Sequence, residues 1–169
     1  MRRGVRVAVD VGTVRVGVAR SDPDGLLATP VETVAVPTGE ELVDGPTRRA
    51  DLLRIGTIVD ETAALEVLVG LPRSLSGREG PSAGLARKYA VEIARLVAPV
   101  PVRLVDERFS SVSANQQLRE AGVRGRRARP VVDQVAAVVF LQAALDGERA
   151  TGRVPGALVV ADGQEAGGP

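Results

Sequence analysis

The feature that most constrains the fold of this chain is an alternating, valine-rich pattern close to its N-terminus. Val5–Val11 has the sequence VRVAVDV and Val14–Ala19 has the sequence VRVGVA, with Gly12 and Thr13 between them. Alternation with many β-branched residues predicts two strands, and the short connection predicts an antiparallel hairpin.

The rest of the chain alternates between strand and helix patterns. A third strand is expected over about Leu26–Val36, where Pro30 favours an edge position or a bulge. Buried strands are expected at Leu65–Leu71 and Val102–Val105, and helices at about Thr47–Thr62, Ser82–Val97, Ser111–Ala121 and Val131–Leu145. A strand-helix-strand order favours parallel pairing. The pattern therefore predicts an α/β fold, with a mixed five-stranded sheet of three antiparallel strands and parallel additions, flanked by helices.

Length and composition fit a single domain. The chain has 169 residues, 44% of them hydrophobic, which suffices for one core. We expect this domain to span residues 1–149, and the glycine-rich residues 150–169 to form a disordered tail. The N-terminus has no signal-peptide pattern and no apolar run approaches the roughly 20 residues of a membrane span, so we expect a cytoplasmic protein without membrane contact.

The chain contains no histidine and no cysteine. This excludes zinc sites built on imidazole or thiolate, and nucleophiles activated by a histidine. Any catalysis has to depend on carboxylates, hydroxyls, arginine, lysine or backbone amides. The net charge of +1 does not by itself indicate a polyanionic partner.

Asp10 is the first candidate for such chemistry, since it interrupts an apolar strand pattern just before a turn. A buried carboxylate without a partner is costly, so it needs a compensating group. A metal ion would supply one. An ion pair with Arg15, or a capping role in the turn, would serve equally well at this stage.

Further acidic residues stand where a strand ends and a helix begins. Asp106 and Glu107 follow the strand Val102–Val105, and Asp133 lies near the start of the last helix. Each has a simpler explanation, an ion pair with Arg108 for the first two and a favourable helix dipole for the third. If they converge on Asp10, the carboxylates repel unless a cation separates them. Mg²⁺ or Mn²⁺ suits such oxygen ligands, and two such ions can activate water against a phosphodiester.

Two segments could bind phosphate. The sequence from Gly70 to Ser74, which includes Arg73, offers amides, a hydroxyl and a guanidinium group. Arg126 and Arg127 belong to the only dense basic run, just ahead of the last helix. Both segments could instead be ordinary solvated loops. Since aromatic residues make up only 2% of the chain, we expect recognition of backbone and shape rather than base stacking.

Four ordered segments carry a resemblance to a known family: VAVDVGTVRVGVA, LVGLPRSLSGREG, VDERFSS and VVDQVAAVVFLQAALD. Over about residues 4–146 the chain resembles the YqgF/RuvX family of pre-16S rRNA nucleases, which is related in fold to the RuvC-type Holliday junction resolvases. The resemblance implies a ribonuclease-H-like fold and a metal site of Asp10, Glu107 and Asp133, which Asp106 assists. It also implies that three further motif residues orient the carboxylates or touch the substrate: Arg15, Arg108 and Ser110.

The expected function is therefore a nuclease with two Mg²⁺ or Mn²⁺ ions, acting as a monomer or homodimer. Its expected substrate is structured RNA in 5′-end maturation of pre-16S rRNA, with branched DNA such as a Holliday junction as a second substrate. One alternative is a non-catalytic protein that binds structured nucleic acid during rRNA processing. Another is an actin-like or sugar-kinase-like phosphotransferase, suggested by Asp10–Thr13 and Gly17 but disfavoured because such proteins need two domains.

Overall fold

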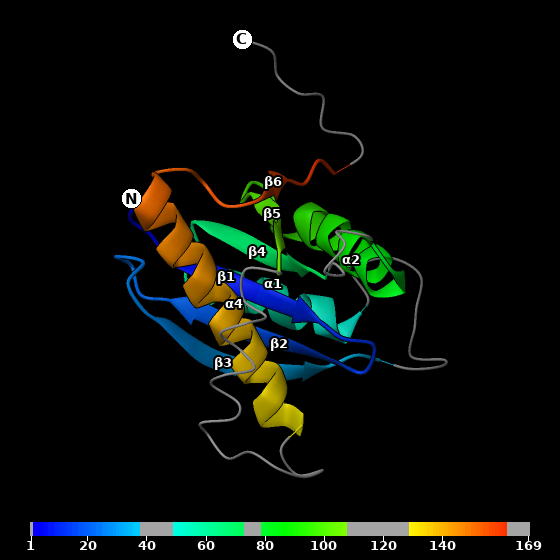
Figure 1. Cartoon of the computed structure of the whole chain (residues 1–169). Helices are drawn as coiled ribbons and strands as arrows, with labels where there is room; N and C mark the ends of the chain where they lie inside the picture. The colour runs from blue at the N-terminus through cyan, green and yellow to red at the C-terminus, as the bar shows by residue number, and fades with distance from the viewer. Residues whose placement is uncertain (1, 38–48, 73–78, 108–128, 162–169) are drawn as a thin grey trace.

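The chain folds around one six-stranded mixed sheet in the order β3-β2-β1-β4-β5-β6 (Figure 1). The computed structural model describes residues 2–37, 49–72, 79–107 and 129–161, without the side chains of residues 129–134. The strands are β1 (Arg6–Val11), β2 (Arg15–Ser21), β3 (Ala28–Ala35), β4 (Glu66–Leu71), β5 (Val102–Asp106) and β6 (Ala157–Leu158). The described helices are α1 (Ala50–Glu61), α2 (Pro81–Val97) and α4 (Arg129–Thr151). β1, β4 and β5 run parallel, and the other pairings are antiparallel.

Strand alternation sorts the side chains onto two differently covered faces. Val7 and Val9 of β1 pack in a core with Leu52 of α1 and Ile93 of α2. Ala8, which points the other way, packs beneath α4, whose core stripe recurs at helical spacing. The residues of that stripe are Ala137, Phe140, Leu141, Ala144 and Leu145. Figure 1 shows α4 crossing one face of the sheet, with α1 and α2 on the other.

Several expectations about the strands are confirmed. The hairpin forms as β1 and β2, and β4 pairs in parallel with β5. β3 lies at the sheet edge, and the register shifts between Val18 and Ala19, where Ala19 pairs with Pro30. A proline cannot donate to the ladder, which explains both the edge position and the irregularity.

The expected number of five strands is wrong, because the C-terminal segment adds a sixth. α4 continues to Thr151, and β6 pairs antiparallel with β5 through Arg103–Leu158 and Leu104–Ala157. We expected a disordered tail from residue 150, and the structure instead places ordered elements as far as β6. The helix expected at Ser111–Ala121 lies outside the described residues.

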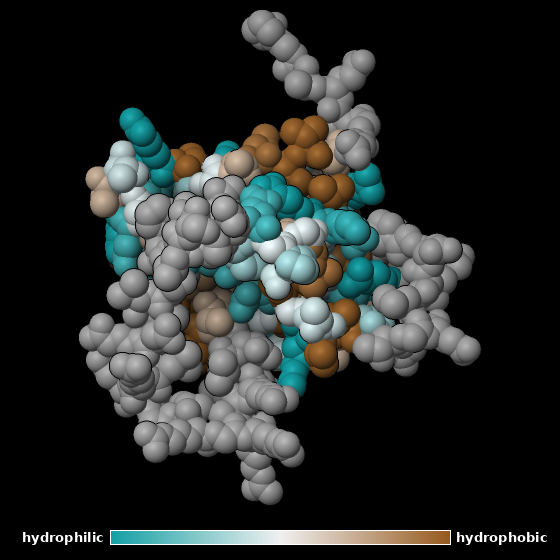
Figure 2. Space-filling view, turned by 45° about the vertical axis from the view of Figure 1, so that its right-hand side comes forward, coloured by the Kyte–Doolittle hydropathy of each residue, from teal (hydrophilic) through white to brown (hydrophobic). Residues whose placement is uncertain are grey.

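The β6 segment leaves apolar side chains on the surface. Leu158 is 55% exposed and Val160 is 62% exposed. Figure 2 shows hydrophobic surface in this region, beside the end of the described chain.

Among the described residues, no helix is long and apolar enough to cross a membrane.

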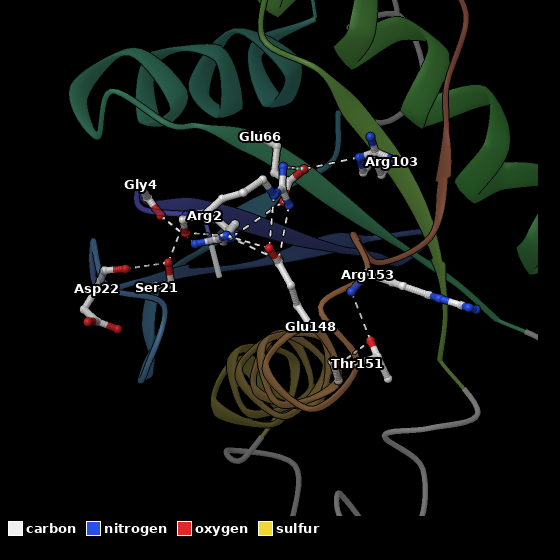
Figure 3. A network of polar contacts seen from close by, with 11 residues as sticks. Arg2, Gly4, Ser21, Asp22, Glu66, Arg103, Glu148, Thr151 and Arg153 are labelled. Atoms are coloured by element: carbon white, nitrogen blue, oxygen red, sulfur yellow. Dashed lines mark hydrogen bonds and ion pairs between the residues drawn. The ribbon is translucent and has the colours of Figure 1, made fainter.

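A buried ionic network fixes the end of the sheet at which the parallel strands begin (Figure 3). Glu66 is fully buried and binds Arg2 at 2.5 Å and Arg103 at 3.2 Å. Glu148 of α4 accepts hydrogen bonds from Arg2 at 3.0 Å and from the fully buried Arg6 at 3.3 Å. The network thus ties the N-terminus, β1, β4, β5 and α4 together.

Candidate active site

Asp10 lies at the opposite end of the sheet, near the carboxyl end of β1. It alternates with Ala8 and therefore faces α4, the helix that carries Asp133. Its partner in β2 is Gly17. The pairing of β1 with β4 runs to Val9–Val69, and one more residue brings Asp10 beside Gly70. Both strands next to Asp10 therefore present glycine rather than a bulkier side chain.

The turn after β1 depends on a second glycine. The Gly12 amide donates to the Arg15 carbonyl oxygen at 2.9 Å, and a Cβ on Gly12 would lie 2.5 Å from that oxygen. A side chain does not fit there, so Gly12 allows the tight reversal. Arg15 alternates with Gly17 and Ala19 on the α4 face of β2, which places it on the same face and at the same end of the sheet as Asp10.

Glu107 directly follows β5 and meets Asp10 across the sheet. Its amide donates to the Leu71 carbonyl oxygen at 3.2 Å, which extends the β4–β5 pairing past the strand end. The Glu107 and Asp10 carboxyl groups share a hydrogen bond. The carboxyl ends of β1 and β5 thus bring two sequence-predicted site residues together, as expected for the edge where ligands bind in parallel sheets.

The electrostatics of this pair differ from those of an ordinary surface carboxylate. Burial, the charge of Asp10, the hydrogen bond to Asp10 and the charge of Asp106 together raise the pKa of Glu107 to about 7. Without a cation, the pair therefore holds a proton near neutral pH. Perturbed carboxyl groups of this kind cluster at functional sites.

Asp106 acts on the pair through its charge. It ends β5 and also borders an apolar cavity of about 540 Å³ next to Phe140 of α4. Asp10 and Glu107 are not among the residues that line this cavity, so the cavity is separate from the carboxyl pair. Within the described part of the chain, no cluster of three candidate metal ligands is found.

The third expected ligand is only partly located. Asp133 lies in the first turns of α4, but its side chain belongs to the residues that the structure does not describe. The other expected substrate contacts, except Arg15, lie outside the described residues: Arg73, Ser74, Arg108, Ser110, Arg126 and Arg127. Gly70 and Leu71, interpreted from the sequence as the start of a phosphate-binding loop, belong to β4.

The strand order, the helix across one face and the carboxyl pair where the parallel strands end define a ribonuclease-H-like protein. The same fold occurs in the RuvC of T. thermophilus, which was solved in complex with a Holliday junction substrate. The two structures align with a TM-score of 0.55 and a sequence identity of 15%, and the alignment covers 89% of this chain and 99% of RuvC. A sequence model of the RuvX family, described as a Holliday junction resolvase, matches residues 4–147. The chain belongs to the RuvX family.

Curated relatives cover almost the whole chain. A protein of Nocardioides sp. (strain ATCC BAA-499 / JS614), provisionally named a pre-16S rRNA nuclease, is 57% identical over 164 residues, which are 94% of this chain and 98% of the relative. A protein of Thermobifida fusca with the same provisional name is 54% identical over 166 residues, with coverage of 94% and 98%. The resemblance to the YqgF/RuvX family is thereby confirmed.

Proposed function

We propose that this chain is a nuclease that uses Mg²⁺ or Mn²⁺ to hydrolyse phosphodiester bonds, with Asp10, Glu107 and Asp133 as metal ligands. The observation that carries the proposal is the hydrogen-bonded, partly buried pair of Asp10 and Glu107. Such a pair has too much negative charge for its surroundings unless it binds a proton or a cation. Carboxylate oxygens are the ligands that hard divalent ions prefer.

The residues around the pair fit a metal ion. The strand residues beside Asp10 are Gly17 and Gly70, and the Glu107 carboxyl group occupies the space that a side chain at residue 70 would fill. Glu107 can give up the shared proton when a cation binds the pair. Bound metal would supply activated water and stabilise the leaving oxygen, in a two-ion arrangement as we propose it. The absence of histidine from the chain is compatible with this chemistry, since carboxylates alone hold the ions.

We propose structured RNA as the substrate, in the 5′-end maturation of pre-16S rRNA, with branched DNA as a second substrate. The names of the relatives support the first, and the Holliday junction complex of RuvC supports the second. We propose that Arg15, which shares the face and the end of the sheet with Asp10, contacts phosphate. The remaining contacts are proposed from the sequence alone: Arg73, Ser74, Arg108, Ser110, Arg126 and Arg127. We propose that Asp106 assists the metal site through its charge.

Cleavage of labelled substrates tests this proposal. Purified chain is incubated with a pre-16S RNA fragment or a four-way DNA junction, each with Mg²⁺, Mn²⁺ or EDTA. We expect metal-dependent cleavage that falls by roughly two orders of magnitude or more in Asp10→Asn. Asp60→Asn, an exposed carboxylate on α1, is the matched control and should retain the wild-type rate.

Two outcomes would contradict the proposal. Cleavage by folded Asp10→Asn at the wild-type rate would remove Asp10 from the site. Tight binding of both substrates without cleavage in either metal would instead support the non-catalytic alternative.

A further inference from the structure

Asp10 and Glu107 come from strands that are not neighbours. Asp10 lies in β1 and Glu107 follows β5, and β4 separates these strands in the sheet. Adjacent strands are about 4.8 Å apart, so the two backbones are roughly 10 Å apart at this level. The hydrogen bond between the two carboxyl groups therefore requires a side chain to pass across β4.

Gly70 is the β4 residue at this crossing. It alternates with Leu68, which packs beneath α4, so its missing side chain would point to the same face as Asp10. A Cβ at residue 70 would overlap Oε1 of Glu107, and would lie 3.0 Å from Cδ and 3.2 Å from Cγ. Only Oε1 would overlap, whereas Cδ and Cγ would be in tight contact, so the Glu107 carboxyl group would have to move.

The conformational freedom of glycine does not explain why position 70 is occupied by this residue type. Gly70 is absent from the described glycines with positive φ, and it has ordinary strand neighbours on both sides. Glycine inside a strand weakens the strand, and its common justification is the close approach of another group. Here the approaching group is the carboxyl group of Glu107.

We propose that Gly70 is a positioning residue of the carboxylate site, whose missing side chain provides the passage through which Glu107 reaches Asp10. Its catalytic meaning rests on the function proposed above, but the passage itself is a matter of geometry. Any side chain at position 70 displaces the Glu107 carboxyl group toward β5 and separates the two proposed ligands.

The first test is a pair of metal-free crystal structures, of the wild type and of Gly70→Ala. We expect an unchanged backbone in β4 and a Glu107 carboxyl group that no longer hydrogen-bonds to Asp10. A Gly70→Ala structure with the Glu107–Asp10 hydrogen bond intact would overturn the inference, whatever the chain does to nucleic acid.

The second test is a double-mutant cycle on Mn²⁺ affinity, measured by electron paramagnetic resonance. Gly70→Ala should weaken binding roughly tenfold or more, whereas adding it to the shorter Glu107→Asp should weaken binding much less. Equal losses in both backgrounds would show a general effect on β4 and overturn the inference. The control is Gly84→Ala on α2, where a Cβ meets nothing within 4 Å. This variant should bind Mn²⁺ with the wild-type affinity.

The two tests separate this inference from the proposed function. If the wild type binds no Mn²⁺ but Gly70→Ala still displaces Glu107, the proposed function fails and the passage remains. If the wild type binds Mn²⁺ and Gly70→Ala binds it equally well, the positioning role of Gly70 is rejected and the proposed function remains. A thermal melt of each variant confirms that it is folded.

Discussion

The carboxyl groups of Glu107 and Asp10 share a hydrogen bond, although their strands are separated by β4. This pair stores a proton near neutral pH in the metal-free chain, because burial and the neighbouring charges raise the pKa of Glu107 to about 7. The proposed metal ion competes with that proton. The stability of the chain and its metal affinity should therefore both depend on pH in a defined direction.

Removal of the Glu107 charge should stabilise the metal-free chain at alkaline pH. The pKa of Glu107 rises from 4.5 to about 7 on folding, so its contribution to stability is complete below pH 4.5 and is lost as the pH rises through 7. In EDTA at pH 8, Glu107→Gln should raise the free energy of unfolding by about 1–3 kcal/mol. Urea denaturation at pH 5 and pH 8 measures the difference, which should be much smaller at pH 5. A destabilised variant at pH 8 would contradict this account.

Metal affinity should rise with pH because binding releases the shared proton. Below pH 7 the apparent Mn²⁺ affinity is expected to increase up to roughly tenfold per pH unit, and to level off above the pKa of Glu107. Calorimetric titration between pH 5.5 and 8.5 measures this dependence. A flat profile would mean that Glu107 is not among the ligands.

The buried ionic network should be a major source of stability. Glu66 is fully buried against Arg2, Arg6 and Arg103, so Glu66→Ala leaves Arg103 without this partner, and Arg2 and Arg6 with Glu148 alone in place of two carboxylates. We expect a loss of about 3–5 kcal/mol in the free energy of unfolding. Glu32→Ala, which breaks the more exposed pair with Arg54, is the control and should cost about 1 kcal/mol or less. Similar losses in the two variants would show that burial of the network contributes little.

Tyr89→Phe should separate stability from activity. The Tyr89 hydroxyl donates to Oδ2 of Asp51 at 2.7 Å in the core between α1 and α2, on the face of the sheet away from Asp10. Its loss should cost about 1–3 kcal/mol, because the acceptor is a buried carboxylate, although Arg49 still holds Asp51 at 2.6 Å. Thermal denaturation measures the loss, and metal-dependent cleavage at a temperature where the variant is folded should be unchanged. A large fall in cleavage would show that the two faces are coupled.

The parts of the fold that could be predicted from the sequence are those encoded locally. The alternation in residues 5–19 predicts the β1–β2 hairpin, and Pro30 predicts the irregular edge strand β3. β6 could not be predicted in this way, since it has two residues and forms through its pairing with β5. The Glu66 network also escaped prediction, because its members are up to 146 residues apart in the sequence.

The candidate site also combines residues that can be recognised from the local sequence with a geometry that depends on distant parts of the chain. Asp10 stands out in the sequence because a carboxylate interrupts an apolar strand, and Glu107 stands out because it follows a buried strand. Their meeting depends on the register of three strands, and the role of Gly70 depends on the position of a Cβ that the residue lacks. From the sequence, Gly70 is interpreted only as the first residue of a phosphate-binding segment, not as a residue that positions Glu107.

The most direct test of the central claim is an anomalous difference map from crystals of the wild-type chain soaked in Mn²⁺. Our account predicts a peak within about 2.0–2.5 Å of carboxylate oxygens of both Asp10 and Glu107, with Asp133 beside it. The peak should vanish in Asp10→Asn crystals soaked in the same way. Fully occupied Mn²⁺ at another site, with Asp10 and Glu107 still joined by their hydrogen bond, would contradict it.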